Sequence, residues 1–118
     1  MGTVLPFPAS SSGRRPAAPQ VVFARSELSR IVDLYGRMVA AGLWKDYAIE
    51  FGPQSASFNA FRRTTERPEY RIEKRPAHSG RHGMWALIGE HGMVIRRGHE
   101  LGSVLSPIER RLLKVVGG

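Results

Sequence analysis

Residues 26–51, SELSRIVDLYGRMVAAGLWKDYAIEF, contain a change of hydrophobic period that decides the fold. In the first part, apolar residues recur every three or four positions, which is the spacing of one face of an α-helix. These residues are Leu28, Ile31, Leu34, Tyr35 and Met38. From Tyr47 to Phe51, apolar residues occupy every second position, as in a half-buried β-strand. The stretch therefore predicts a helix that is followed closely by a strand.

Both ends of this helix carry recognisable signals. Ser26 is of the type that caps helix N-termini, and Glu27 lies beside the positive end of the helix dipole. Gly42 suits the left-handed conformation in which many helices end. We therefore expect a helix from Ser26 to Ala41, preceded by a short apolar lead-in at residues 21–23 that docks on the domain.

Four further segments with strand character follow, separated by turn residues. They are residues 56–62, 69–74, 84–88 and 93–97, with a turn at residues 52–55 and a hairpin connection at residues 89–92. Short links favour antiparallel neighbours, because parallel strands need crossover connections of about a dozen residues. The sequence therefore predicts a five-stranded antiparallel sheet.

The two ends of the chain differ in character. Residues 99–106 have the apolar spacing of a short helix, and Ser106, Pro107 and Glu109 have the spacing of a new helix start, which would run to Val116. Residues 1–20 are rich in Pro, Ser, Ala and Gly and have no hydrophobic period, which is typical of a disordered tail. Residues 21–116 then form a single domain.

The predicted fold class is α+β. An N-terminal helix precedes the five-stranded antiparallel sheet, and a short C-terminal helix or helices follow it. Both helical regions would cover one face of the sheet and leave the other partly in contact with water. The predicted core consists of Leu28, Ile31, Tyr35, Met38, Ile49, Phe51, Tyr70, Ile72, Leu87, Ile95 and Leu101.

Four segments occur in the order LSRIVDLYGRMVAAGLWKDYAIEF, FRR, YRIEKRP and VIRRGHELGSVL, within about residues 23–106. In these segments the chain resembles an alphaproteobacterial family known only as a domain of unknown function. The resemblance implies a bacterial, cytoplasmic protein. It implies no activity, ligand or catalytic residue.

Several classes of chemistry have no sequence signal. Cysteine is absent, which excludes disulfides and thiolate sites, and the glycine-rich phosphate loops and the nucleophile elbow of hydrolases are missing. His78 and His82 have helical ligand spacing, but Pro76, Gly80 and Gly83 argue against a helix there, so we interpret both as exposed loop residues. No apolar run suits a secretory signal or a membrane span. We predict a non-enzymatic cytoplasmic protein without cofactor or metal.

Charge is the one feature that points to a partner. The chain has a formal net charge of +8, and residues 62–82 hold seven basic residues against three acidic ones. The candidate binding residues are Arg62, Arg63, Arg67, Arg71, Lys74, Arg75, Arg96 and Arg97, with Phe61 as a stacking surface. One hypothesis is a basic sheet face that binds nucleic acid or a ribonucleoprotein. The alternatives are an adaptor or accessory subunit that docks on a larger acidic protein complex, and a solvated sheet face with cross-strand ion pairs.

Overall fold

The computed structural model describes residues 19–64 and 67–117 and has the element order that the sequence predicts. The elements are α1 (Arg25–Ala40), β1 (Asp46–Phe51), β2 (Ala56–Phe61), β3 (Tyr70–Lys74), η2 (Pro76–His78), β4 (Trp85–Gly89), β5 (Val94–Gly98) and α2 (Leu101–Val116). The α+β class with an N-terminal helix, five strands and a C-terminal helix is confirmed. Most of the predicted disordered tail, residues 1–18, lies outside the described residues.

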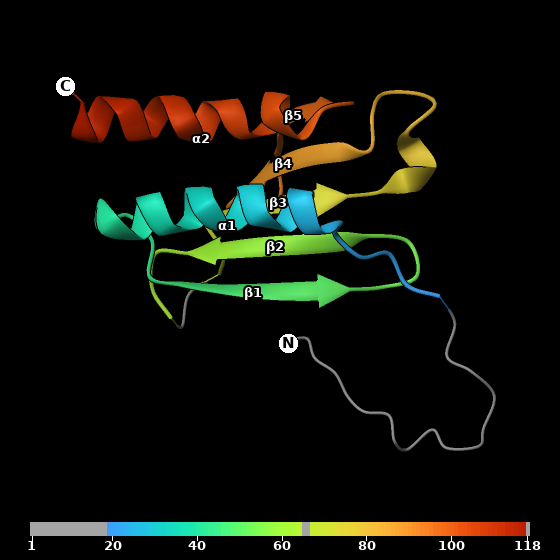
Figure 1. The fold of residues 1–118 in the computed structure, drawn as a ribbon, viewed down its shortest axis with the longest axis horizontal. Coiled ribbons are helices and arrows are strands. Elements are labelled where there is room, and N and C mark those ends of the chain that lie inside the picture. The colour runs from blue at the N-terminus through green and yellow to red at the C-terminus, as the bar shows by residue number, and fades with distance from the viewer. Residues whose placement is uncertain (1–18, 65–66, 118) are drawn as a thin grey trace, which may run out of the picture.

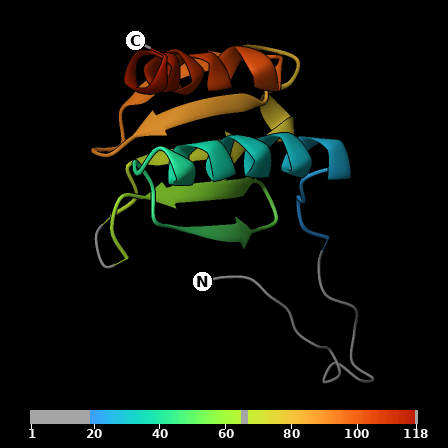
Figure 2. The same ribbon diagram turned by 60° about the vertical axis from the view of Figure 1, so that its left-hand side comes forward.

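The five strands form one antiparallel sheet in the order β1-β2-β3-β4-β5. Each strand pairs with its neighbour in sequence, because links of this length allow only a hairpin-like return. Helices α1 and α2 run side by side over one face of the sheet (Figures 1 and 2). The described chain places no helix on the other face.

Helix α1 begins and ends through hydrogen bonds that the sequence only partly predicts. Its N-cap is Ala24 rather than Ser26, because the Glu27 carboxylate turns back and accepts a hydrogen bond of 2.7 Å from the Ala24 N–H. At the other end Gly42 has a φ of 78°. There the Leu43 N–H donates to Met38 O and the Gly42 N–H donates to Val39 O, which is the Schellman arrangement.

Of the one or two C-terminal helices that the sequence allows, the structure has one, and the separate helix start predicted at Ser106 is wrong. Helix α2 is continuous, with Pro107 inside it. Proline has no N–H, so the Ser103 carbonyl lacks its usual donor within the helix. Arg96 donates to this oxygen instead, at 3.4 Å. The helix continues past Pro107 because Ile108 and Leu112 are buried beside the sheet.

The core lies between the helices and the sheet. Among the predicted core residues, Ile31, Met38, Ile72 and Leu87 are buried, and Leu28, Tyr35, Ile49, Tyr70 and Leu101 pack against the core while partly exposed. Phe51 and Ile95 are wrongly predicted, since 37% and 45% of their surfaces are exposed. Phe51 ends the edge strand β1. Ile95 lies in the other edge strand, where the register shifts between Leu87 and Ile88 and interrupts the alternation.

Candidate functional site

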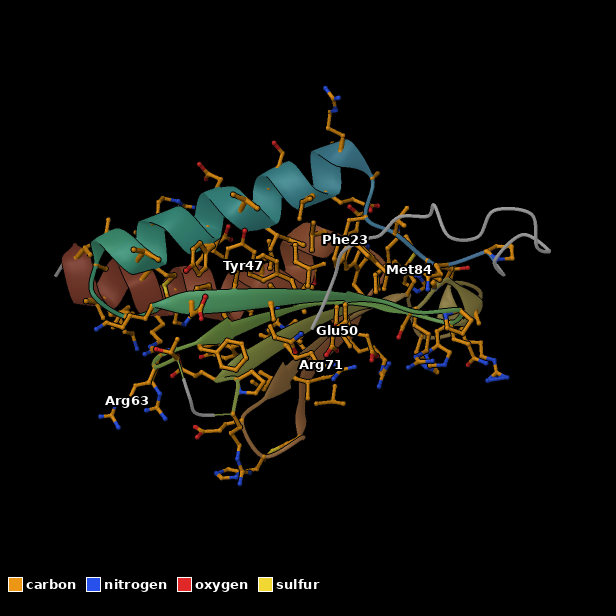
Figure 3. The ribbon with its side chains drawn as sticks, turned by 90° about the horizontal axis from the view of Figure 1, so that it is seen from below. Phe23, Tyr47, Glu50, Arg63, Arg71 and Met84 are labelled. Carbon is orange, nitrogen blue, oxygen red and sulfur yellow. The ribbon has the colours of Figure 1, made fainter. Side chains whose placement is uncertain are left out.

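The face of the sheet that the helices leave uncovered collects the polar residues of the strands. Its side chains alternate with those of the core, and we call this surface the open face. The register places on it Asp46, Ala48, Glu50, Ser57, Asn59, Phe61, Arg71, Glu73, Ala86, Ile88, Val94 and Arg97. Figure 3 shows Glu50 and Arg71 on the side of the sheet away from α1, whereas Phe23 and Tyr47 lie on the helix side.

The middle of the open face is a hydrogen-bonded polar floor. Ser57 and Asn59 are buried even though no helix of the described chain covers this face. The Asn59 amide donates to Ala48 O at 3.2 Å and to Ser57 Oγ at 3.3 Å, and Ser57 Oγ donates to Glu50 at 3.4 Å. These bonds orient the floor without any contribution from the arginines.

Arg71 and Arg75 share a single carboxylate, that of Glu73. The Arg71 Nη2 atom is 3.6 Å from Glu73 Oε2, and the Arg75 Nη2 atom is 3.4 Å from the same oxygen. Arg71 Nε is buried and has no hydrogen-bond partner within residues 19–64 and 67–117. One buried carboxylate thus offsets two guanidinium groups, and the donors of Arg71 are not saturated.

Arg97 lies on the same face in β5 and is exposed. In the register it stands opposite Ala86, which in turn pairs with Glu73. It forms no ion pair with any described residue. Its guanidinium group is therefore available to an external anion.

Two of the predicted binding residues lie on the other side of the sheet. Lys74 points toward α1, where its ammonium group donates to Glu27 at 2.7 Å and to Val22 O at 3.0 Å and lies 5.9 Å from the centre of the Trp85 ring. Arg96 points toward α2 and holds the Ser103 carbonyl. Both side chains connect helices or the lead-in to the sheet rather than extending the open face.

The remaining three predicted arginines gather at the sheet end where β2 stops. Arg62 is 3.2 Å from Glu90, and Arg67 is 3.5 Å from the His91 ring. Arg62, Arg63 and Arg111 line a pocket of about 300 Å³ beside Gly42 and Leu43. Figure 3 shows Arg63 at the opposite end of the sheet from Met84.

Glu69 limits the positive charge of this pocket. Its carboxylate accepts hydrogen bonds of 3.0 Å from both the Trp44 indole and Arg111. Burial would lower the pKa of Arg111, but hydrogen bonds to Tyr70 and Glu69 raise it above its usual value. Arg111 thus acts as a structural cation that ties α2 to β3.

A second group of basic side chains gathers at the other end, where the loop 76–83 meets the end of β5. We call it the histidine corner. It comprises His78, Arg81, His82, Arg97 and His99. The centres of the His78 and His82 rings are 4.7 Å apart. Arg97 belongs to both the corner and the open face.

Comparison with known proteins identifies the family. Residues 21–105 match the model described as "Protein of unknown function (DUF2794)". The chain belongs to this family. No curated protein and no solved structure matches it.

The boundaries of the DUF2794 match divide the candidate surfaces. Residues 21–105 contain the whole open face and the histidine corner. Arg111, which lines the arginine pocket, lies beyond the match. The two surfaces that are complete within the DUF2794 domain are therefore the stronger candidates for its function.

Two kinds of feature are absent from the described part of the DUF2794 protein. No group of three or more His, Cys, Asp or Glu residues is placed to hold a metal ion among residues 19–64 and 67–117. Within the same ranges, no helix combines the length and apolar character needed to cross a membrane.

The sequence prediction missed the histidine corner. The sequence pattern favours exposed loop positions for His78 and His82 and a helix start for His99. The local sequence signal is the glycine at position 83, which the structure shows to have a φ of 101°. The sequence does not reveal that the backbone at Gly83 contacts Gly98 and His99, because only the tertiary fold brings them together.

Proposed function

We propose that the protein binds single-stranded nucleic acid through the open face and has no catalytic role. The observation that carries this proposal is Arg97, an exposed guanidinium group without an ion-pair partner in the described chain, on a face that no helix covers. Arg71, whose side chain is 39% exposed, lies on the same face. Arginine presents a planar fork of donors that matches the geometry of phosphate.

The other residues of the open face are compatible with an extended single strand of nucleic acid. Ser57 and Asn59 are short and buried, so they add no bulk to the middle of the open face. Phe61 is partly exposed at the end of β2 and offers a ring on which a base can stack. Glu50 and Glu73 oppose phosphate, but Glu73 is already paired with two arginines. The phosphates would therefore follow the arginines rather than the floor.

Replacing the open-face arginines tests the proposal. Arg97→Glu combined with Arg71→Gln should weaken binding to single-stranded RNA roughly tenfold or more and make it less dependent on salt, since each lost phosphate contact removes about 0.7 from the slope of log K against log salt. The loss should be similar for all sequences, because phosphate contacts carry no base information. Fluorescence anisotropy at two salt concentrations measures both effects.

A matched control distinguishes binding at a defined site from binding that depends only on the net charge of the protein. Arg25→Glu combined with Arg110→Gln changes the net charge by the same amount, and both residues are exposed on helices, away from the open face. We expect these helix substitutions to leave binding within about twofold. Equal losses in both double variants, or no binding of the wild type at low salt, would contradict the proposal.

An adaptor role has an observation of its own. An apolar groove of about 300 Å³ lies between the last turns of α1 and α2, and its lining residue Leu113 is 65% exposed. A protein partner with an acidic surface would suit this groove, because the chain carries a net charge of +8 and Arg37 lies at the groove. A stoichiometric partner that survives nuclease treatment and is lost with Leu113→Asp would favour this role. Partners lost on nuclease treatment would favour nucleic-acid binding.

A further inference from the structure

The histidine corner is held together by a close approach of two backbones. A Cβ atom at Gly83 would overlap the Gly98 carbonyl and lie 2.7 Å from the His99 N atom. Only glycine fits this contact, since φ at position 83 is also positive. The loop 76–83 is thereby pressed against the end of β5, which brings His82 within electrostatic range of Arg97.

The loop itself is ordered by its own hydrogen bonds. His78 O accepts from the Arg81 N–H at 3.0 Å and from the Gly83 N–H at 3.1 Å. The Arg75 N–H donates to Met84 O at 2.6 Å, which extends the pairing of β3 with β4 up to the loop. These bonds order the backbone of the loop that carries His78, Arg81 and His82.

The groups that act on His82 are all basic side chains. They come from His78 and Arg81 in the loop, and from Arg97 and His99 at the end of β5. Desolvation, and after it repulsion from these groups, lowers the pKa of His82 below its usual value. In addition, His78 Nδ1 is buried and lacks a hydrogen-bond partner in the described part of the chain. A buried polar atom without a partner calls for an explanation, such as a ligand or a water molecule.

We propose that the histidine corner binds a phosphate group between Arg81, Arg97 and the His78–His82 pair. An anion at this point would relieve the repulsion among the cations and accept hydrogen bonds from guanidinium and imidazolium groups. Free phosphate and the terminal phosphate of a nucleic-acid strand share this chemistry. The inference goes beyond the proposed function, because a free ion would satisfy it without any strand.

The site is expected to be pH-dependent. A bound anion stabilises the protonated imidazoles, so it raises the pKa of His82, and by linkage protonation strengthens binding. Affinity should therefore increase as the pH falls through the range in which histidine titrates, about pH 5–8. Phosphate also loses charge over part of this range, whereas sulfate stays a dianion. The pH dependence of sulfate binding therefore reports the protonation of the protein alone.

The test is a histidine titration by NMR on the whole chain, with and without inorganic phosphate at constant ionic strength. We expect phosphate to raise the pKa of His82 by about half a unit or more, which is a threefold change in proton affinity. His91 is the internal control, because it lies beside Arg67 at the other end of the sheet. No shift at His82, or equal shifts at His82 and His91, would overturn the proposal.

Variants distinguish this site from the open face. Arg81→Gln should remove most of the phosphate-induced shift at His82, whereas Arg67→Gln should leave it intact. Arg71→Gln should weaken RNA binding and leave the shift unchanged. If RNA does not bind but the shift at His82 persists, the proposed function fails and the phosphate site stands. If RNA binding depends on Arg71 while phosphate causes no shift, the phosphate site fails alone.

Oligonucleotides identify the source of the phosphate. If the corner takes a strand terminus, an RNA with a 5′-phosphate should bind at least threefold more tightly than the same RNA with a 5′-hydroxyl, and Arg81→Gln should abolish the difference. Equal binding of the two RNAs, with the phosphate-induced shift retained, assigns the corner to a free phosphate ion.

Discussion

Phe58→Ala is expected to lower the free energy of unfolding by about 3–5 kcal/mol, the range for truncation of a buried aromatic residue. Phe58 is fully buried in β2. Its ring stacks on Tyr47, with 5.1 Å between centres, and meets the edge of Tyr35 at 5.9 Å. The substitution therefore removes one of the aromatic contacts that join α1 to the first two strands. Chemical denaturation followed by circular dichroism measures the loss.

Phe61→Ala in the same strand is the matched control. Phe61 lies on the open face and is partly exposed, so its truncation should cost about 1 kcal/mol or less in stability. It should instead weaken RNA binding, by about 1–3 kcal/mol if a base stacks on the ring. Similar stability losses for both variants would mean that the two faces of β2 are wrongly assigned.

The elements of the fold were predictable because their hydrophobic periods are strong. The helical spacing from Leu28 to Met38 and the alternation from Tyr47 to Phe51 each match one structure only. Pro107 shows where local rules fail. Its usual effect is to interrupt a helix, but the buried side chains that follow it and a donor from β5 outweigh that effect.

The candidate site was only partly predictable. Lys74 has the same parity in β3 as Tyr70 and Ile72, so alternation alone places it on the covered face. The register shift between Leu87 and Ile88 places Arg96 on the helix side and Arg97 on the open face. Uninterrupted alternation along β5 would give the reverse, and no sequence pattern reveals the shift. The histidine corner depends on a contact between residues far apart in the chain, and only the folded structure brings these residues together.

Gly83→Ala is expected to destabilise the protein by about 2–5 kcal/mol, the sum of a left-handed backbone cost and an overpacking cost. The methyl group would meet the backbone of Gly98 and His99, and backbone cannot move aside as a flexible side chain can. Because relief requires the loop to leave β5, we also expect the folded variant to lose the phosphate-induced shift at His82. Thermal unfolding and the NMR titration measure the two effects.

Substitutions of two other glycines separate the backbone cost of Gly83→Ala from its overpacking cost. Gly92 has a φ of 84° but open space around it, so Gly92→Ala should show the backbone cost alone, about 1–2 kcal/mol. Gly80 lies in the same loop as Gly83, with no positive φ and no atom within 4 Å, so Gly80→Ala should change stability by about 0.5 kcal/mol or less. If Gly83→Ala cost no more than Gly92→Ala, the contact with β5 would not be what holds the loop. The corner would then lack the rigidity on which a defined phosphate site depends.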